Sequence, residues 1–172
     1  MANKEALREL QHRLAERLQE ARSTSRGRAW LAVECGGRGF LFPLKEAGEI
    51  FPMTALAPVS HSHPWFLGVA NLRGHLHGVV DLAGFFGIKA SAELRDQTML
   101  VAFNASLDVN VALLVDRLAG LRSEEQLVLD AEAPADAPPF VSQRLRDAAG
   151  RVWQEISLSQ LVRHEAFLKI VS

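Results

Sequence analysis

Residues 68–82 read Gly-Val-Ala-Asn-Leu-Arg-Gly-His-Leu-His-Gly-Val-Val-Asp-Leu, and the fold is worked out from this stretch. The apolar residues before Asn71 and after Gly74 predict two strands, joined by a turn at or near Arg73-Gly74. Asp81 predicts the N-cap of a short helix, because a carboxylate there can accept a hydrogen bond from a free amide of the first helical turn. The alternation within the two strands predicts that Val69, Leu72, Val79 and Val80 are buried.

A similar pattern returns near the C-terminus. Residues 150–158 match residues 74–82, with Ser157 in the place of Asp81. Ser157 and Gln160 also form a capping box, which predicts a last helix. Strand–turn–strand patterns elsewhere give many short strands, which favour small barrels or a sandwich. Each half alone is too small to form a large hydrophobic core, so we expect the two halves to share one core.

The composition is that of an ordinary globular chain. Hydrophobic residues make up 48% and charged residues 23% of the 172 residues, which excludes wholesale disorder. The net charge of −1 disfavours nucleic acid as the main partner. The single cysteine, Cys35, cannot form an internal disulfide, and no apolar run approaches the ~20 residues of a transmembrane helix. We therefore expect a cytoplasmic protein without direct membrane insertion.

Residues 1–28 differ in character from the rest of the chain, because basic side chains outnumber acidic ones there. Apolar residues recur at steps of three and four, on one stripe of an amphipathic helix: Leu7, Leu10, Leu14, Leu18 and Ala21. Two interpretations stay open for this helical extension. The stripe packs on the protein's own body, or it docks to another protein.

The pattern Gly-x-x-Asn-Leu-Arg-Gly at 68–74, followed by Val-Asp-Leu at 80–82 and a helix ending in Phe-Gly, resembles the CheW-like chemotaxis coupling family. Glu49-Ile50 is similar to the Glu-Ile site of that family, and residues 113–118 resemble the strand before its central crossover. The resemblance covers about residues 29–168.

The resemblance implies a mainly β fold. Two small five-stranded SH3-like β-barrel subdomains would share a hydrophobic seam, with an N-terminal helix and short helices that close each half. It implies a helical extension at 1–28 and a CheW-like domain at 29–172. Within this domain, approximately 29–45 plus 98–172 would form one intertwined half and 46–97 the other.

The resemblance also implies a non-enzymatic adaptor. Such a protein joins the cytoplasmic tip of a methyl-accepting chemoreceptor to the regulatory domain of a histidine kinase, and can be recruited to membrane receptor arrays. The extension and Phe42-Pro43 look like the pilus-associated, PilI-type branch, which implies control of type IV pilus twitching motility. The family's Ile-Asp before the last helix is Ile156-Ser157 here, which keeps a cap. No cofactor and no metal are implied.

Five residues are the predicted partner-binding positions: Arg73, Glu49, Asn71, Leu72 and Gly74. The guanidinium of Arg73 can offer five donors in a fixed fork to a carboxylate or to backbone carbonyls of a partner. It can equally brace its own loop against a carboxylate such as Glu49. Asn71 is expected to hydrogen-bond loop backbone.

Four histidines, His61, His63, His75 and His77, support an alternative function. Residues i and i+2 of a strand share a face, so each pair could contribute to a metal site, and four imidazoles could surround zinc. The alternative is a small β-barrel module with a histidine-centred metal- or ligand-binding function. The sequence contains no Gly-x-Ser-x-Gly, His-Glu-x-x-His or phosphate-loop motif, and we expect no enzymatic activity.

Overall fold

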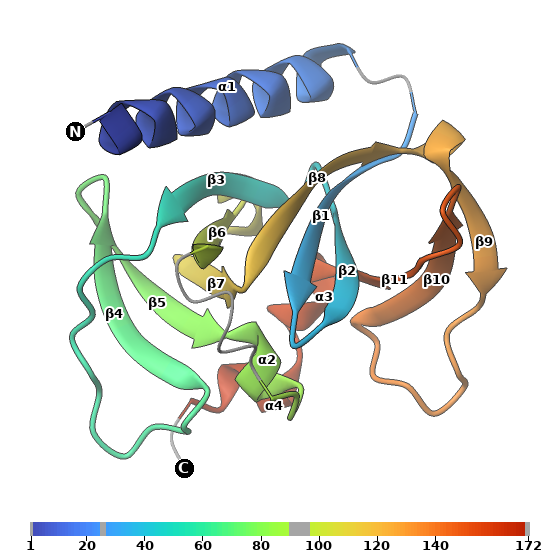
Figure 1. The fold of residues 1–172 in the computed structure, drawn as a ribbon. Coiled ribbons are helices and arrows are strands. Elements are labelled where there is room, and N and C mark those ends of the chain that lie inside the picture. The colour runs from blue at the N-terminus through green and yellow to red at the C-terminus, as the bar shows by residue number, and fades with distance from the viewer. Residues whose placement is uncertain (1, 25–26, 90–96, 171–172) are drawn as a thin grey trace.

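The computed structural model describes residues 2–24, 27–89 and 97–170. Short strands dominate it, and the predicted mainly β class is confirmed (Figure 1). The strands are β1 (Ala29–Cys35), β2 (Arg38–Pro43), β3 (Ala47–Pro52), β4 (Phe66–Leu72), β5 (His75–Asp81), β6 (Met99–Phe103), β7 (Val111–Val115), β8 (Arg117–Ser123), β9 (Leu127–Ala131), β10 (Val141–Asp147) and β11 (Val152–Ile156). The α-helices are α1 (Ala2–Thr24), α2 (Leu82–Phe85), α3 (Leu158–Leu161) and α4 (Glu165–Leu168), and two 3₁₀ turns are η2 (Ala105–Leu107) and η3 (Glu124–Gln126).

The strands form two sheets. Sheet A has six strands in the order β8-β1-β2-β11-β10-β9, and sheet B has five strands in the order β3-β6-β7-β5-β4. Sheet B has the five strands expected for each half. Sheet A has one more than expected, because β9 pairs along the outer side of β10.

The internal repeat seen in the sequence is present in the structure. The hairpins β4–β5 and β10–β11 are each followed by a short helix, α2 in one case and α3 in the other. In each sheet the second strand of this hairpin runs parallel to a strand of another hairpin, β5 beside β7 and β11 beside β2. The two sheets therefore share one strand plan, apart from β9.

Each sheet combines parts of both repeats. Sheet A takes β1 and β2 from the start of the chain and its other strands from residues 117–156. Strands β6 and β7 pair with β3 and β5, so residues 99–115 belong to sheet B. The predicted division had grouped residues 98–172 with 29–45, and sheet membership differs from it over 99–115. The reason is that a local strand pattern does not reveal a distant parallel partner.

A hydrophobic seam joins the two halves, as predicted. Strand β1 is buried on both faces: Leu31 and Val33 belong to the seam cluster, whereas Trp30 and Ala32 belong to a separate cluster within sheet A. A third cluster, containing Leu72 and Val79, fills sheet B. The seam also holds apolar side chains of both sheets and of the short helices, among them Phe42, Val80, Val101, Leu113, Ile156 and Leu161.

Three of the four burial predictions for the first hairpin are confirmed. Leu72, Val79 and Val80 are buried, but Val69 is only half-buried. Val69 lies on β4, at the edge of sheet B, where a single bridge to Ala57 covers it. Residues 55–59 form no strand beyond that bridge, so Val69 is left partly open to solvent.

The N-terminal helix forms as predicted and runs along β3 (Figure 1). Leu7 and Leu10 are 54% and 58% exposed, so the interpretation that the stripe packs on the protein's own body is wrong for these two residues. Leu14 is half-buried, and the side chains of Leu18 and Ala21 lie outside the described residues. Among the helices that the structure describes, none combines the length and the apolar character needed to cross a membrane.

Asp81 occupies the N-cap position of α2 as predicted, but its side chain closes no capping hydrogen bond. The equivalent Ser157 does cap α3, because its Oγ accepts a hydrogen bond from the amide of Gln160 at 3.3 Å. Burial is the main cause that raises the pKa of the Asp81 carboxyl; the nearby backbone amides of Gly84 and Ala83 oppose it in part, and the charge of Asp116 adds to it, so the net shift is upward. Ionised Asp81 is therefore unfavourable for the folded state.

Replacing Asp81 with asparagine is expected to stabilise the protein at pH 7. A carboxyl whose pKa is raised by folding lowers the free energy of unfolding as the pH rises through its folded pKa. Below the unfolded pKa of about 3.9 both states hold the proton, so the gain of Asp81→Asn should vanish there. Chemical denaturation of both proteins at pH 7 and pH 3 measures this. A gain that is the same at both pH values would contradict the prediction.

Candidate partner-binding site

The turn between β4 and β5 holds Arg73 in an unusual backbone conformation. Arg73 and Gly74 have φ angles of 52° and 82°, as the two central residues of a type I′ hairpin turn require. Such positive values are uncommon for an arginine. The Asn71 side chain supports the turn, because its Oδ1 accepts a hydrogen bond from the Gly74 amide at 2.8 Å. The expectation that Asn71 bonds loop backbone is therefore confirmed.

Arg73 pairs with Glu49 of β3, which is the intramolecular alternative considered from the sequence. Arg73 Nη1 lies 2.7 Å from Glu49 Oε1, and the two side chains are 73% and 49% exposed. An ion pair this exposed contributes only about 0–1 kcal/mol to stability. It therefore orients the guanidinium without closing it off from a partner.

The structure brings the five predicted positions together at one end of sheet B, and we call them the Glu49–Arg73 corner: Glu49, Asn71, Leu72, Arg73 and Gly74. Leu72 is 4% exposed and packs in the core of sheet B, so its side chain anchors the corner from inside. A cavity of about 300 Å³ adjoins the corner, between α1, β3 and Arg73.

The four histidines fall into two separate places. His75 and His77 line a second hollow beside Arg73, and His77 Nδ1 lies 3.0 Å from the carbonyl oxygen of His75. His63 stacks on Trp65 at 5.2 Å, and its amide donates to the carbonyl oxygen of Ile170. Within residues 2–24, 27–89 and 97–170, no group of three or more His, Cys, Asp or Glu side chains is arranged to hold a metal ion.

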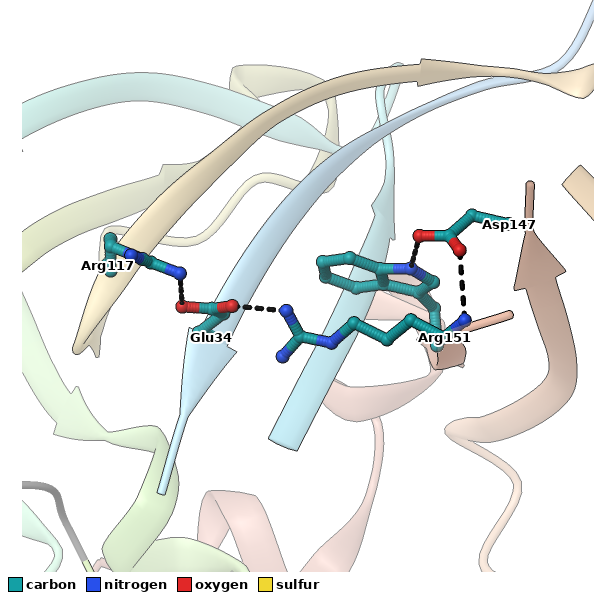
Figure 2. Close-up of polar contacts among 5 residues, drawn as sticks. Glu34, Arg117, Asp147 and Arg151 are labelled. Atoms are coloured by element: carbon teal, nitrogen blue, oxygen red, sulfur yellow. Dashed lines mark hydrogen bonds and ion pairs between the residues drawn. The ribbon is translucent and has the colours of Figure 1, made fainter. Parts of the chain in front are cut away.

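A second polar cluster, in sheet A, was missed by sequence reasoning. Glu34 of β1 is 6% exposed and forms ion pairs with both Arg117 of β8 and Arg151, the residue before β11 (Figure 2). The available signal was a lone glutamate inside the apolar strand Ala29–Cys35, because a buried charge needs partners.

The electrostatics keep Glu34 ionised. Burial acts to raise its pKa, but the hydrogen bond and charge of Arg151, together with those of Arg117, outweigh burial and lower the pKa below its ordinary value. Glu34 thus connects β1 to the start of β8 and to the residue that precedes β11. Arg117 and Arg151 remain 45% and 37% exposed, so the cluster lies at the surface end of sheet A.

Asp147 and Trp153 fix the position of Arg151. Asp147 Oδ1 accepts a hydrogen bond from the Arg151 amide at 2.9 Å, and Oδ2 accepts one from Trp153 Nε1 at 3.0 Å (Figure 2). The Trp153 bond is the main cause that lowers the pKa of Asp147. The guanidinium carbon of Arg151 lies 4.4 Å from the Trp153 ring centroid, a cation–π contact. This cluster ties the β10–β11 turn to β1, whereas Arg73 ties the equivalent β4–β5 turn to β3.

Residues 29–166 match the family model of the CheW-like domain. The chain belongs to the CheW-like family. The match covers both sheets and begins after α1, so the CheW-like domain carries an N-terminal helix outside the matched part.

Several relatives of this CheW-like protein extend the match. It is 29% identical over 143 residues to Protein PilI of Pseudomonas aeruginosa, covering 81% of this chain and 78% of the relative. It is 27% identical over 132 residues to Chemotaxis protein CheW of Thermotoga maritima, covering 77% of this chain and 85% of the relative.

A solved structure of similar fold is the scaffolding protein TtCheW from Thermoanaerobacter tengcongensis. It superposes on this CheW-like chain with a TM-score of 0.68 at 16% sequence identity, covering 85% of this chain and 99% of that one. The likeness confirms the predicted fold of two SH3-like subdomains.

Proposed function

We propose that this CheW-like protein is a non-enzymatic adaptor in chemosensory signalling. It couples the cytoplasmic tip of a chemoreceptor to the regulatory domain of a histidine kinase. Support comes from the family match over residues 29–166 and from the similarity to proteins named as chemotaxis and scaffolding proteins. The similarity to PilI over 81% of the chain supports the finer proposal that the pathway controls type IV pilus twitching motility.

The observation that carries the proposal is the exposed Arg73–Glu49 pair. The type I′ turn and the Asn71 side chain hold Arg73 at the tip of a hairpin, where most of its side chain faces solvent. Because the pair adds little to stability, its position is explained better by contact with a partner than by the needs of the fold. A guanidinium already oriented by Glu49 loses less conformational entropy when it binds a carboxylate or backbone carbonyls.

Replacing Arg73 with asparagine is expected to weaken at least one of the two complexes by about tenfold or more, as for an arginine at the centre of an interface. Asparagine tolerates the left-handed backbone better than arginine, so stability should be unchanged or slightly higher. The measurement is titration of the wild type and Arg73→Asn against a receptor cytoplasmic fragment and, separately, against the kinase regulatory domain.

Arg146→Asn is the matched control. Arg146 also forms an exposed ion pair, with Asp130 at 2.6 Å, but it lies on β10 of sheet A. The control should bind both partners normally. Normal binding by Arg73→Asn would remove the Glu49–Arg73 corner as the site, and a folded wild type that binds neither partner would overturn the adaptor function itself.

A further inference from the structure

Helix α1 rests on the Glu49–Arg73 corner. The cavity between them is lined on one side by Glu49, Ile50, Phe51 and Arg73, and on the other by residues of α1: Arg8, Gln11, His12, Leu14 and Ala15. The family match begins at residue 29, so α1 is an addition to the CheW-like domain that lies across the proposed binding site.

The α1 residues that line the cavity are mostly polar or small, and the half-buried Leu14 is the one large apolar side chain among them. Arg8, Gln11, His12 and Ala15 are spaced i, i+3, i+4 and i+7, which places them on one side of the helix. The larger leucines Leu7 and Leu10 point to solvent instead. Burial of apolar surface is the main source of docking free energy, so α1 is held weakly on the corner.

The described ion pairs of α1 also run along the helix. Arg13 pairs with Glu9 at 2.7 Å, and His12 pairs with Glu16 at 3.2 Å. These i,i+4 pairs support the helix itself. Beneath it, the side chains of Ile50 and Phe51 are half-buried, so apolar surface is available to a helix with a better matched face.

We propose that α1 covers the β3 side of the Glu49–Arg73 corner in the free protein, and that an amphipathic helix of the partner displaces α1 when it binds. The displacing helix would place an apolar side chain against Ile50 and Phe51 and a carboxylate near Arg73. Arg73 and Glu49 stay exposed beside α1, but the surface of Ile50 and Phe51 that faces α1 is free only in the fraction of molecules from which α1 has moved. For a partner helix that needs this surface, α1 therefore lowers the apparent affinity by that fraction. The identity of the partner rests on the proposed function, whereas the position of α1 does not.

The test is a reversible tether between α1 and β3. The variant Ala15→Cys/Pro52→Cys places one thiol on each side of the cavity, and a bis-maleimide with a central disulfide can link them. The natural Cys35 will not compete, because burial raises its pKa to about 12 and keeps it a thiol. Leu10→Cys/Pro52→Cys is the matched control, because Leu10 lies on the exposed side of the helix.

We expect efficient linking for Ala15→Cys/Pro52→Cys and little for the control. The linked chain should bind the corner's partner about tenfold more weakly or worse, and cleavage of the linker with a reductant should restore binding. Equal linking in both variants would show that α1 does not rest on the corner. A linked chain that binds as tightly as the cleaved one would overturn displacement. If the cleaved chain binds neither partner, the adaptor function and displacement fail together, while the linking yields still decide where α1 rests.

Discussion

Replacing Trp153 with alanine is expected to lower the free energy of unfolding by about 3–5 kcal/mol, the usual cost of emptying the site of a large buried side chain. Trp153 is 1% exposed and packs with Trp30 and Leu41 in the core of sheet A. Gly39 is part of this fit, because a Cβ there would lie 2.5 Å from the indole ring. The variant would also leave Asp147 without its indole donor. Urea denaturation of wild type and variant measures the loss.

Two further variants separate the contribution of the Trp153–Asp147 hydrogen bond from that of indole packing, and provide a control on an exposed side chain. Trp153→Phe keeps an aromatic ring but removes the hydrogen bond to Asp147, so it should cost less than alanine, on the order of 1–2 kcal/mol for the bond alone. Val128→Ala removes an apolar side chain that is 70% exposed and should cost little. If Trp153→Ala were as mild as Val128→Ala, the proposed packing of sheet A around the indole would be wrong.

Replacing Glu34 with glutamine is expected to cost about 2–4 kcal/mol at pH 7, slightly less than the range for breaking a fully buried pair. The expected loss is smaller because Arg117 and Arg151 are partly exposed, so water screens their charges after the carboxylate is gone. Glutamine keeps the size of the side chain, so the loss reports charge and hydrogen bonding.

The loss should depend on pH. The folded pKa of Glu34 is lowered, so its stabilisation is fully present above the unfolded pKa of about 4.3 and disappears as the pH falls through the folded pKa. The difference between wild type and Glu34→Gln should therefore shrink in acid. Glu49→Gln, which breaks an exposed pair, is the control and should cost no more than about 1 kcal/mol. A deficit for Glu34→Gln that matches this control, or that does not change with pH, would contradict the prediction.

The first hairpin could be predicted from the sequence because its determinants are local. Asn71, Arg73 and Gly74 lie within four consecutive positions, and the turn they form fixes the register of the two strands around it. The repeat was recognisable for the same reason, since each copy carries its own turn and cap. The pairing of Arg73 with Glu49 was already one of the two alternatives that the sequence left open.

The parts that could not be predicted depend on distant contacts. Glu34 and its partner Arg151 are 117 positions apart, so no local pattern connects them. The exposure of Leu7 and Leu10 is likewise set by how α1 lies on the surface it meets and not by the helical period, which is the same for either orientation. Strands β6 and β7 were assigned to the other half because their pattern is equally compatible with both sheets.

The exchange of hairpins between the sheets also sets the order in which the protein can assemble during synthesis. Every strand of sheet B has left the ribosome once residue 115 is free, whereas sheet A needs the chain as far as Ile156. Strands β1 and β2 emerge early but must wait for their flanking strands, and long-range pairings of this kind are slow to form. Sheet B can therefore be complete while the β1–β2 hairpin, in which β1 carries apolar residues on both faces, still lacks its neighbouring strands. A nascent chain at this stage would expose that hairpin to chaperones and to other unfinished copies.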